Sequence, residues 1–142
     1  MVNYTTSSQN TLKTASTQST EQFIWNYLCN FYEDYQVAGI MGNLWQENRF
    51  NTEGDGIAQW LGGRLERLRQ RENPQDLATQ LNYIIHELQT TERHAHNMLV
   101  STTSVEEATT AFQNYYERCN PYYCMQAQRI AYAVDFYWKN KA

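Results

Sequence analysis

Glu47 is the residue whose type and position most clearly suggest chemistry. It lies seven residues after Ile40 and three after Leu44, so at about 100° per residue its carboxyl group shares their inward helical face. The negative end of a helix dipole and partial burial both disfavour a charged carboxylate. A Glu kept protonated near neutral pH is what a general acid needs. The alternative is a solvated Glu at a fraying helix end, paired with Arg49.

The elements that must position Glu47 are all predicted to be helical. Apolar residues recur at helical spacing along most of the chain, and no segment of useful length alternates with period two. The sequence therefore predicts an all-α fold of about six helices with an irregular loop over residues 51–63. The expected helices cover residues 19–31, 34–47, 64–72, 74–88 with an extension to 96 or 99, 103–115 and 127–138.

Four helix starts are predicted from local signals. Ser19 with Gln22 and Thr103 with Glu106 have the spacing of capping boxes. Asp34 is expected to cap the helix that carries Glu47. The dipeptide Asn73-Pro74 is expected to begin a further helix, with Pro at the first helical position.

Length and composition predict one folded domain. The chain has 142 residues, 42% hydrophobic and 14% aromatic, which suffices for a single core. We expect residues 1–19 to be a flexible polar leader and residues 20–142 to fold. The net charge of −4 argues against nucleic acid as a partner. No apolar run is long enough to span a membrane, and no signal peptide is visible at the N-terminus.

The cysteines and histidines give weaker signals. Cys119 and Cys124 bracket a turn-like stretch and can close a small loop, but three reduced thiols fit the sequence equally well. His94 and His96 are two residues apart on a predicted helix and so point in different directions, and His86 is a further turn away. We therefore expect no metal site and no cofactor.

Two motifs carry a resemblance to a known family. The helix end GIMGNLWQENRFN at residues 39–51, followed by GDGIAQWLGGR at residues 54–64, resembles the phage tail lysozyme domain of the lysozyme-like superfamily. It is more distantly similar to goose-type lysozymes and lytic transglycosylases. Weaker matches in LATQLNYIIHEL and TTSVEEATTAFQNYYER extend the resemblance over about residues 20–138. Asn48 stands where the family usually has Ser, Ala58 where Gly is commoner, and Cys119 where Pro is frequent.

The resemblance implies a lysozyme-like enzyme that cleaves the glycan backbone of peptidoglycan, with Glu47 as the general acid. Glycosidases usually pair two carboxyl groups, about 5 Å apart for retention and roughly 6.5–9.5 Å apart for inversion. Asp55 is the preferred second carboxylate and Glu53 its rival, although Asp55 is as well explained as a turn former. Some relatives need no second acid, so the sequence leaves this group open.

Further substrate contacts follow from the same resemblance. Gln59 and Trp60 are expected opposite Glu47, where an amide bonds sugar groups and an aromatic ring packs on a pyranose. Arg64 is expected to meet carboxylates of the peptide stems. The resemblance also assigns substrate contact to Tyr116 and Glu117. Packing in the core is the alternative for Trp60 and Tyr116, and a solvated helix face for Arg64.

Three functions remain open at this point. The first is a muramidase that cuts the β-1,4 bond from N-acetylmuramic acid to N-acetylglucosamine, or a lytic transglycosylase that cuts the same bond. The second is an inactive module that only binds peptidoglycan, and the third is a structural phage tail component. The resemblance implies an extracellular or virion-associated protein, with other phage tail or cell-wall hydrolase domains as partners.

Overall fold

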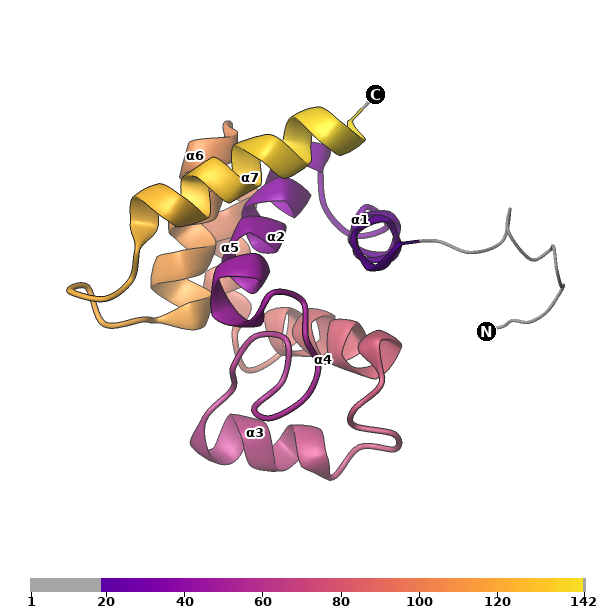
Figure 1. Cartoon of the computed structure of the whole chain (residues 1–142). Helices are drawn as coiled ribbons and strands as arrows, with labels where there is room; N and C mark the ends of the chain where they lie inside the picture. The colour runs from indigo at the N-terminus through magenta and orange to yellow at the C-terminus, as the bar shows by residue number, and fades with distance from the viewer. Residues whose placement is uncertain (1–18, 142) are drawn as a thin grey trace, which may run out of the picture.

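The structure, a computed structural model, describes residues 19–141, and within that range every regular element is helical. The predicted all-α fold is confirmed. The expected polar leader, except for Ser19, lies outside the described residues. The helices are α1 (Thr20–Leu28), α2 (Asp34–Asn48), α3 (Gly62–Arg69), α4 (Leu77–Gln89), α5 (Arg93–Val100), α6 (Val105–Ala111), the π-helix η1 (Phe112–Glu117) and α7 (Gln126–Asn140) (Figure 1).

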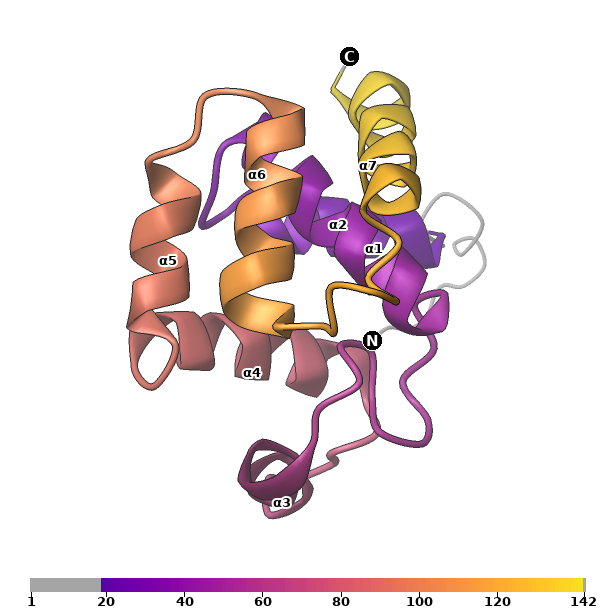
Figure 2. The same cartoon turned by 90° about the vertical axis from the view of Figure 1, so that its left-hand side faces the viewer.

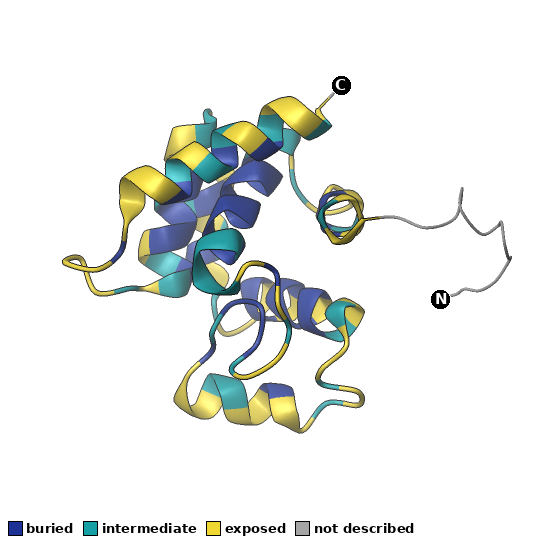
Figure 3. Ribbon diagram, in the orientation of Figure 1, coloured by how far each residue is buried: buried dark blue, intermediate teal, exposed yellow. Residues whose placement is uncertain are grey.

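Helix α2 forms the centre of the fold. Its residues from Gln36 to Leu44 are all buried, and Figure 3 shows its ribbon as the most continuously buried of the helices. It packs mainly against α7 and α6, which lie side by side across it (Figure 2). Helix α3 and the loop that leads to it lie beyond the C-terminal end of α2 (Figure 1).

Two glycines allow these helices to approach α2 closely. A Cβ atom on Gly42 would lie 2.5 Å from the carbonyl oxygen of Arg129 and 2.7 Å from Cβ of Ala133. A Cβ atom on Gly39 would lie 2.7 Å from the backbone nitrogen of Thr109. Both distances are too short for real contacts, so the backbones of α7 and α6 rest directly on α2.

The first predicted cap is confirmed and the second is off by one residue. The side chain of Ser19 accepts a hydrogen bond from the backbone N–H of Gln22. Helix α2 is capped by Glu33 rather than Asp34, because Glu33 and Gln36 exchange the two bonds of a capping box. Asp34 becomes the first helical residue, where its negative charge still favours the helix N-terminus.

The two later starts also differ from the predictions. The cap of α6 is Ser104 rather than Thr103, because its hydroxyl accepts from the backbone N–H of Glu107 at 3.1 Å. Asn73-Pro74 lies in a turn, and α4 begins after Asp76. The expected extension of α4 toward residues 96 or 99 is wrong, because the chain turns after Gln89 and starts α5 at Arg93.

The segment after α6 winds as a π-helix. Residues Phe112–Glu117 continue α6 without a break and end at Arg118, whose backbone is left-handed with φ 53°. The sequence predicts ordinary α-helix here. π-helical turns are rare and are often found at functional sites, so η1 draws attention to its last residues, Tyr116 and Glu117.

Replacing Gly42 with Ala should destabilise the protein, because the added methyl group must push α7 away from α2. Overpacking of this kind costs about 1–3 kcal/mol. Gly63→Ala is the matched control, since its Cβ would meet only the flexible end of Arg67 at 3.2 Å and Ala favours a helix. Urea unfolding of both variants measures the difference, and equal stabilities would contradict the close packing at Gly42.

Candidate functional site

Helix α2 ends next to Glu47 in a way that separates this residue from Arg49. Arg49 has a left-handed backbone with φ 53°, and its N–H bonds the carbonyl of Trp45. Its guanidinium lies 5.2 Å from the ring centroids of both Trp45 and Tyr132. The predicted alternative, a solvated Glu47 paired with Arg49, therefore does not describe this helix end.

The cation beside Glu47 is Arg129 of α7. Its Nη2 lies 2.8 Å from Oε2 of Glu47, and the Arg129 side chain is only 4% exposed. The same guanidinium donates from Nη1 to Oδ1 of Asn43 at 3.0 Å and from Nε to the carbonyl of Cys124 at 2.6 Å. Three bonds thus fix one buried cation against the end of α2.

This ion pair is an interaction that the electrostatic argument from the sequence did not include. That argument considered burial and the helix dipole around Glu47, whereas the folded protein also places a buried guanidinium at bonding distance. Arg129 could not be singled out, because it lies far along the chain in a helix with ordinary periodicity. Its interaction with Glu47 exists only in the folded protein.

Glu117, at the end of η1, is the second carboxyl group of this site. Its Oε2 is buried and has no hydrogen-bond partner among the described residues. Burial raises the pKa of Glu117 well above its usual range, and the negative charge of Glu47 raises it further, while Arg129 and Arg64 act in the opposite direction. Glu117 therefore holds a proton in the pH range where an ordinary Glu is ionised.

The site contains a candidate acid–base arrangement of three residues, Glu47, Glu117 and Arg129. We call them the carboxyl pair and its arginine. Glu47 is ion-paired with Arg129, whereas Glu117 has a buried Oε2 and a raised pKa. Two carboxyl groups in such unlike environments can hold one proton between them. Such a pair can deliver a proton to a bound group and keep a negative charge beside it.

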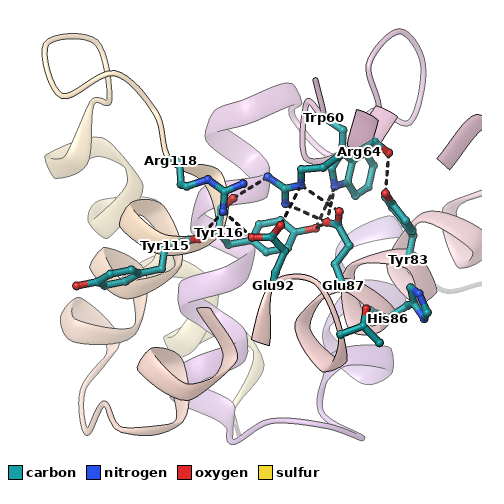
Figure 4. Close-up of polar contacts among 10 residues, drawn as sticks. Trp60, Arg64, Tyr83, His86, Glu87, Glu92, Tyr115, Tyr116 and Arg118 are labelled. Carbon is teal, nitrogen blue, oxygen red and sulfur yellow. Dashed lines mark hydrogen bonds and ion pairs between the residues drawn. The ribbon is translucent and has the colours of Figure 1, made fainter. Parts of the chain in front are cut away.

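A second set of polar contacts forms a buried network around Glu87 of α4 (Figure 4). Arg64 donates to both carboxylate oxygens of Glu87, at 2.9 and 3.0 Å. Tyr116 donates to Oε1 at 2.7 Å and Trp60 at 3.1 Å. Burial alone would raise the pKa of Glu87, but these hydrogen bonds outweigh it and lower the pKa.

The same network extends along η1 to its C-terminal end. Nη1 of Arg64 donates to the carbonyl of Tyr116 at 3.1 Å. Glu92 is paired with Arg118 at 2.5 Å and lies 3.7 Å from Arg64. These bonds fix the last turn of η1, which carries Glu117.

Three residues expected to contact substrate belong to this network instead. Trp60 is 2% exposed and Tyr116 is fully buried, so neither presents a ring face to a sugar. Arg64 uses its guanidinium on Glu87 and on the carbonyl of Tyr116. Their types matched the family pattern, but their buried hydrogen bonds could not be inferred from sequence spacing.

The loop between α2 and α3 holds the other predicted site residues. Oδ1 of Asp55 lies 3.8 Å from Nη2 of Arg69 on α3, and both side chains are substantially exposed. Gln59 has a left-handed backbone with φ 56°, and its amide donates to the carbonyl of Gly56 at 2.9 Å. Both contacts are local to this loop and α3, so they support the loop's shape rather than an interaction with Glu47.

Asn48, the residue that departs from the family pattern, also shapes this loop. Its amide donates to the carbonyls of Asn51, Glu53 and Gly56 at 3.0, 3.4 and 3.5 Å. Asn48 therefore folds the chain back beside the end of α2. This bonding gives the Asn at the position after Glu47 a structural role.

The cysteine pairing that the sequence left open is a disulfide. Cys119 and Cys124 are bonded to each other, and Cys29 is free and exposed. No cluster of three or more metal-binding side chains is found within residues 19–141. In the same part of the chain no helix is long and apolar enough to cross a membrane.

Glu117→Gln should change how stability depends on pH. Because the folded protein holds the Glu117 proton and the unfolded chain releases it near pH 4.3, wild-type stability has a component that falls between that pH and the raised pKa. The variant lacks this component. As the pH rises through this range, the unfolding free energy of the variant minus that of the wild type should therefore increase by up to about 1.4 kcal/mol per pH unit. Urea titrations from pH 4 to 8 measure it.

Glu53→Gln, an exposed substitution in the loop, is the control and should give a curve parallel to the wild type. If the Glu117→Gln curve is also parallel, Glu117 does not hold a proton in the folded state.

Comparison with known families identifies the fold that carries this site. The model of the phage tail lysozyme family matches residues 19–139, a range that includes the carboxyl pair and its arginine. No curated protein and no solved structure matches the chain. At the level of the family, the match implies a glycosidase-type enzyme related to lysozyme, with peptidoglycan as its substrate class. The chain belongs to the phage tail lysozyme family.

Proposed function

We propose that this protein is a muramidase that cleaves the β-1,4 bond from N-acetylmuramic acid to N-acetylglucosamine in peptidoglycan. The observations that carry the proposal are the ion pair of Glu47 with the buried Arg129 and the buried, unpartnered Oε2 of Glu117, a carboxyl group whose raised pKa responds to both Glu47 and Arg129. Glycoside cleavage needs a proton on the leaving oxygen and negative charge beside an oxocarbenium-like transition state. In this proposal the carboxyl pair supplies both the proton and the negative charge.

In this proposal Glu47 is the catalytic acid and Glu117 acts through it. The pair supplies a proton through Glu47 to the glycosidic oxygen as the bond to the anomeric carbon breaks. Water then adds to that carbon, and the proton that water loses returns to the pair. Arg129 stabilises the pair while it carries net negative charge. No metal or organic cofactor takes part in these steps.

The mechanism also needs a group that activates water. The family resemblance suggests Asp55, whose nearest charged partner is Arg69. The carboxyl pair is better supported, because Arg129 fixes Glu47 at the end of α2, whereas Asp55 and its partner Arg69 are both substantially exposed. In a lytic transglycosylase, a hydroxyl group of the substrate would replace the water.

The family also indicates where the enzyme acts. We infer a virion-associated protein that meets the cell wall from outside, with other phage tail or wall-hydrolase domains as its neighbours. The glycan strand is the proposed macromolecular substrate.

A second function, binding of the glycan without cleavage, is favoured by the ion pair of Glu47. A carboxylate held at 2.8 Å from a buried guanidinium is a poor proton donor unless Glu117 supplies the proton. In a binding module, the same charges would only contact sugar hydroxyl groups.

Glu47→Gln should abolish cleavage, because an amide cannot donate a carboxyl proton. Loss of a general acid lowers rates by about 10²–10⁴-fold. The measurement is turbidity loss of purified peptidoglycan, with mass spectrometry of the released fragments. Fragments ending in reducing muramic acid mean hydrolysis, and 1,6-anhydro ends mean transglycosylation.

Glu66→Gln, an exposed substitution on α3, is the matched control for this experiment and should clear the wall at the wild-type rate. Circular dichroism checks that Glu47→Gln is folded, since Arg129 loses its charged partner. Cleavage by folded Glu47→Gln at the wild-type rate would refute the assigned role. Binding of the wall without cleavage by the wild type would favour the binding module.

A further inference from the structure

The loop between η1 and α7 displays two tyrosines to solvent. Tyr122 is 90% exposed and Tyr123 is 78% exposed, the highest values among the large hydrophobic side chains of the described residues. In Figure 1 this loop extends away from the helices on one side of the molecule. Exposed neighbouring aromatic rings leave apolar surface in contact with water, which often marks a binding surface.

The loop that carries these rings is held in one shape. The Cys119–Cys124 disulfide closes it, and Cys124 is buried. The backbone N–H of Tyr122 donates to Oδ1 of Asn120, and that of Tyr123 to the carbonyl of Asn120, both at 2.9 Å. The rings are thus presented on a braced turn, which reduces the entropy lost when they bind something.

Both ends of this loop are attached to the carboxyl pair and its arginine. The chain enters the loop two residues after Glu117. It leaves through Cys124, whose carbonyl accepts from Nε of Arg129 at 2.6 Å, while Nη2 of the same guanidinium lies 2.8 Å from Glu47. The side chain of Arg129 therefore joins the loop that carries Tyr122 and Tyr123 to Glu47, the proposed catalytic carboxylate.

The chemistry of the loop fits a saccharide. Residues 119–124 are CNPYYC and carry no charged side chain, so they offer no cation to the carboxylates of peptide stems. A pyranose ring has an apolar C–H face that packs on an aromatic ring, and a phenol hydroxyl can bond the sugar's polar edge. An uncharged pair of rings on a loop joined to Arg129 therefore suits the glycan strand itself.

We propose that Tyr122 and Tyr123 form a platform on which the glycan strand packs beside the Glu47–Glu117 pair. The proposal rests on the proposed function, which supplies the glycan as substrate. It adds a binding subsite to the site, made by a loop that the Cys119–Cys124 disulfide closes. The platform binds sugar rings and takes no part in proton transfer.

The test is Tyr122→Ala/Tyr123→Ala, compared with Trp138→Ala. Trp138 is an aromatic residue, 66% exposed, near the far end of α7. Binding is measured by cosedimentation with purified peptidoglycan stripped of its peptide stems, and cleavage by fragment release at increasing substrate concentration. The double variant should need about tenfold more substrate for half-saturation in both assays, as expected for two lost ring contacts.

The maximal rate of the double variant should stay at the wild-type value, because the carboxyl pair is untouched. Tyr122→Phe/Tyr123→Phe should recover most of the lost binding, since it restores the ring faces. Trp138→Ala should behave as the wild type.

The outcomes separate this proposal from the proposed function. If the wild type binds stripped glycan but does not cleave it, while the double Ala variant binds more weakly, the platform stands and the muramidase proposal fails. If the double Ala variant binds and cleaves like the wild type, the platform is refuted and the muramidase proposal stands. If Trp138→Ala lost as much glycan binding as the double Ala variant, the platform would also be refuted, because the effect would not be specific to the loop.

Discussion

The guanidinium of Arg129 is the interaction on which the proposed site depends. It is buried on α7 and bonds Asn43 and Glu47 of α2 together with the carbonyl of Cys124. Removing one partner of a buried charge is costly, about 3–5 kcal/mol, so these three contacts hold each other in place. They require α7 to lie directly on α2, which the missing side chain of Gly42 allows.

A second buried charge cluster holds η1 in place through Tyr116. Glu87 and Arg64 bond each other and hold Tyr116 in the core. Glu117 follows Tyr116 along η1, and both Arg64 and Arg129 affect its pKa. Two consecutive residues of η1 therefore serve different purposes: Tyr116 anchors the turn and Glu117 joins the carboxyl pair. Structure and proposed chemistry thus depend on the same few residues.

Local patterns in the sequence were sufficient for the fold class and for the position of Glu47. Helical periodicity, a cap at Ser19 and a carboxylate on an apolar face are visible within a few residues. The caps of α2 and α6 lay one residue from the predictions, because neighbouring side chains compete for the same backbone groups. Arg129 was missed because its partner is distant in the chain.

The burial of predicted contact residues could not be foreseen for a related reason. Trp60 and Tyr116 match positions that the family resemblance associates with the substrate, and an aromatic residue suits either a sugar or a core. Only the fold shows that both rings face Glu87. Tyr122 and Tyr123, in contrast, carry no periodic signal, and their exposure became evident with the braced loop.

The most direct test of the central claim is the pH dependence of glycan cleavage by Glu117→Gln beside the wild type. If the two carboxyl groups share one proton, the variant loses its proton source, and its activity at neutral pH should fall while the alkaline limb moves to lower pH. A profile that matches the wild type in both rate and position would contradict the account, because Glu47 would then work without Glu117.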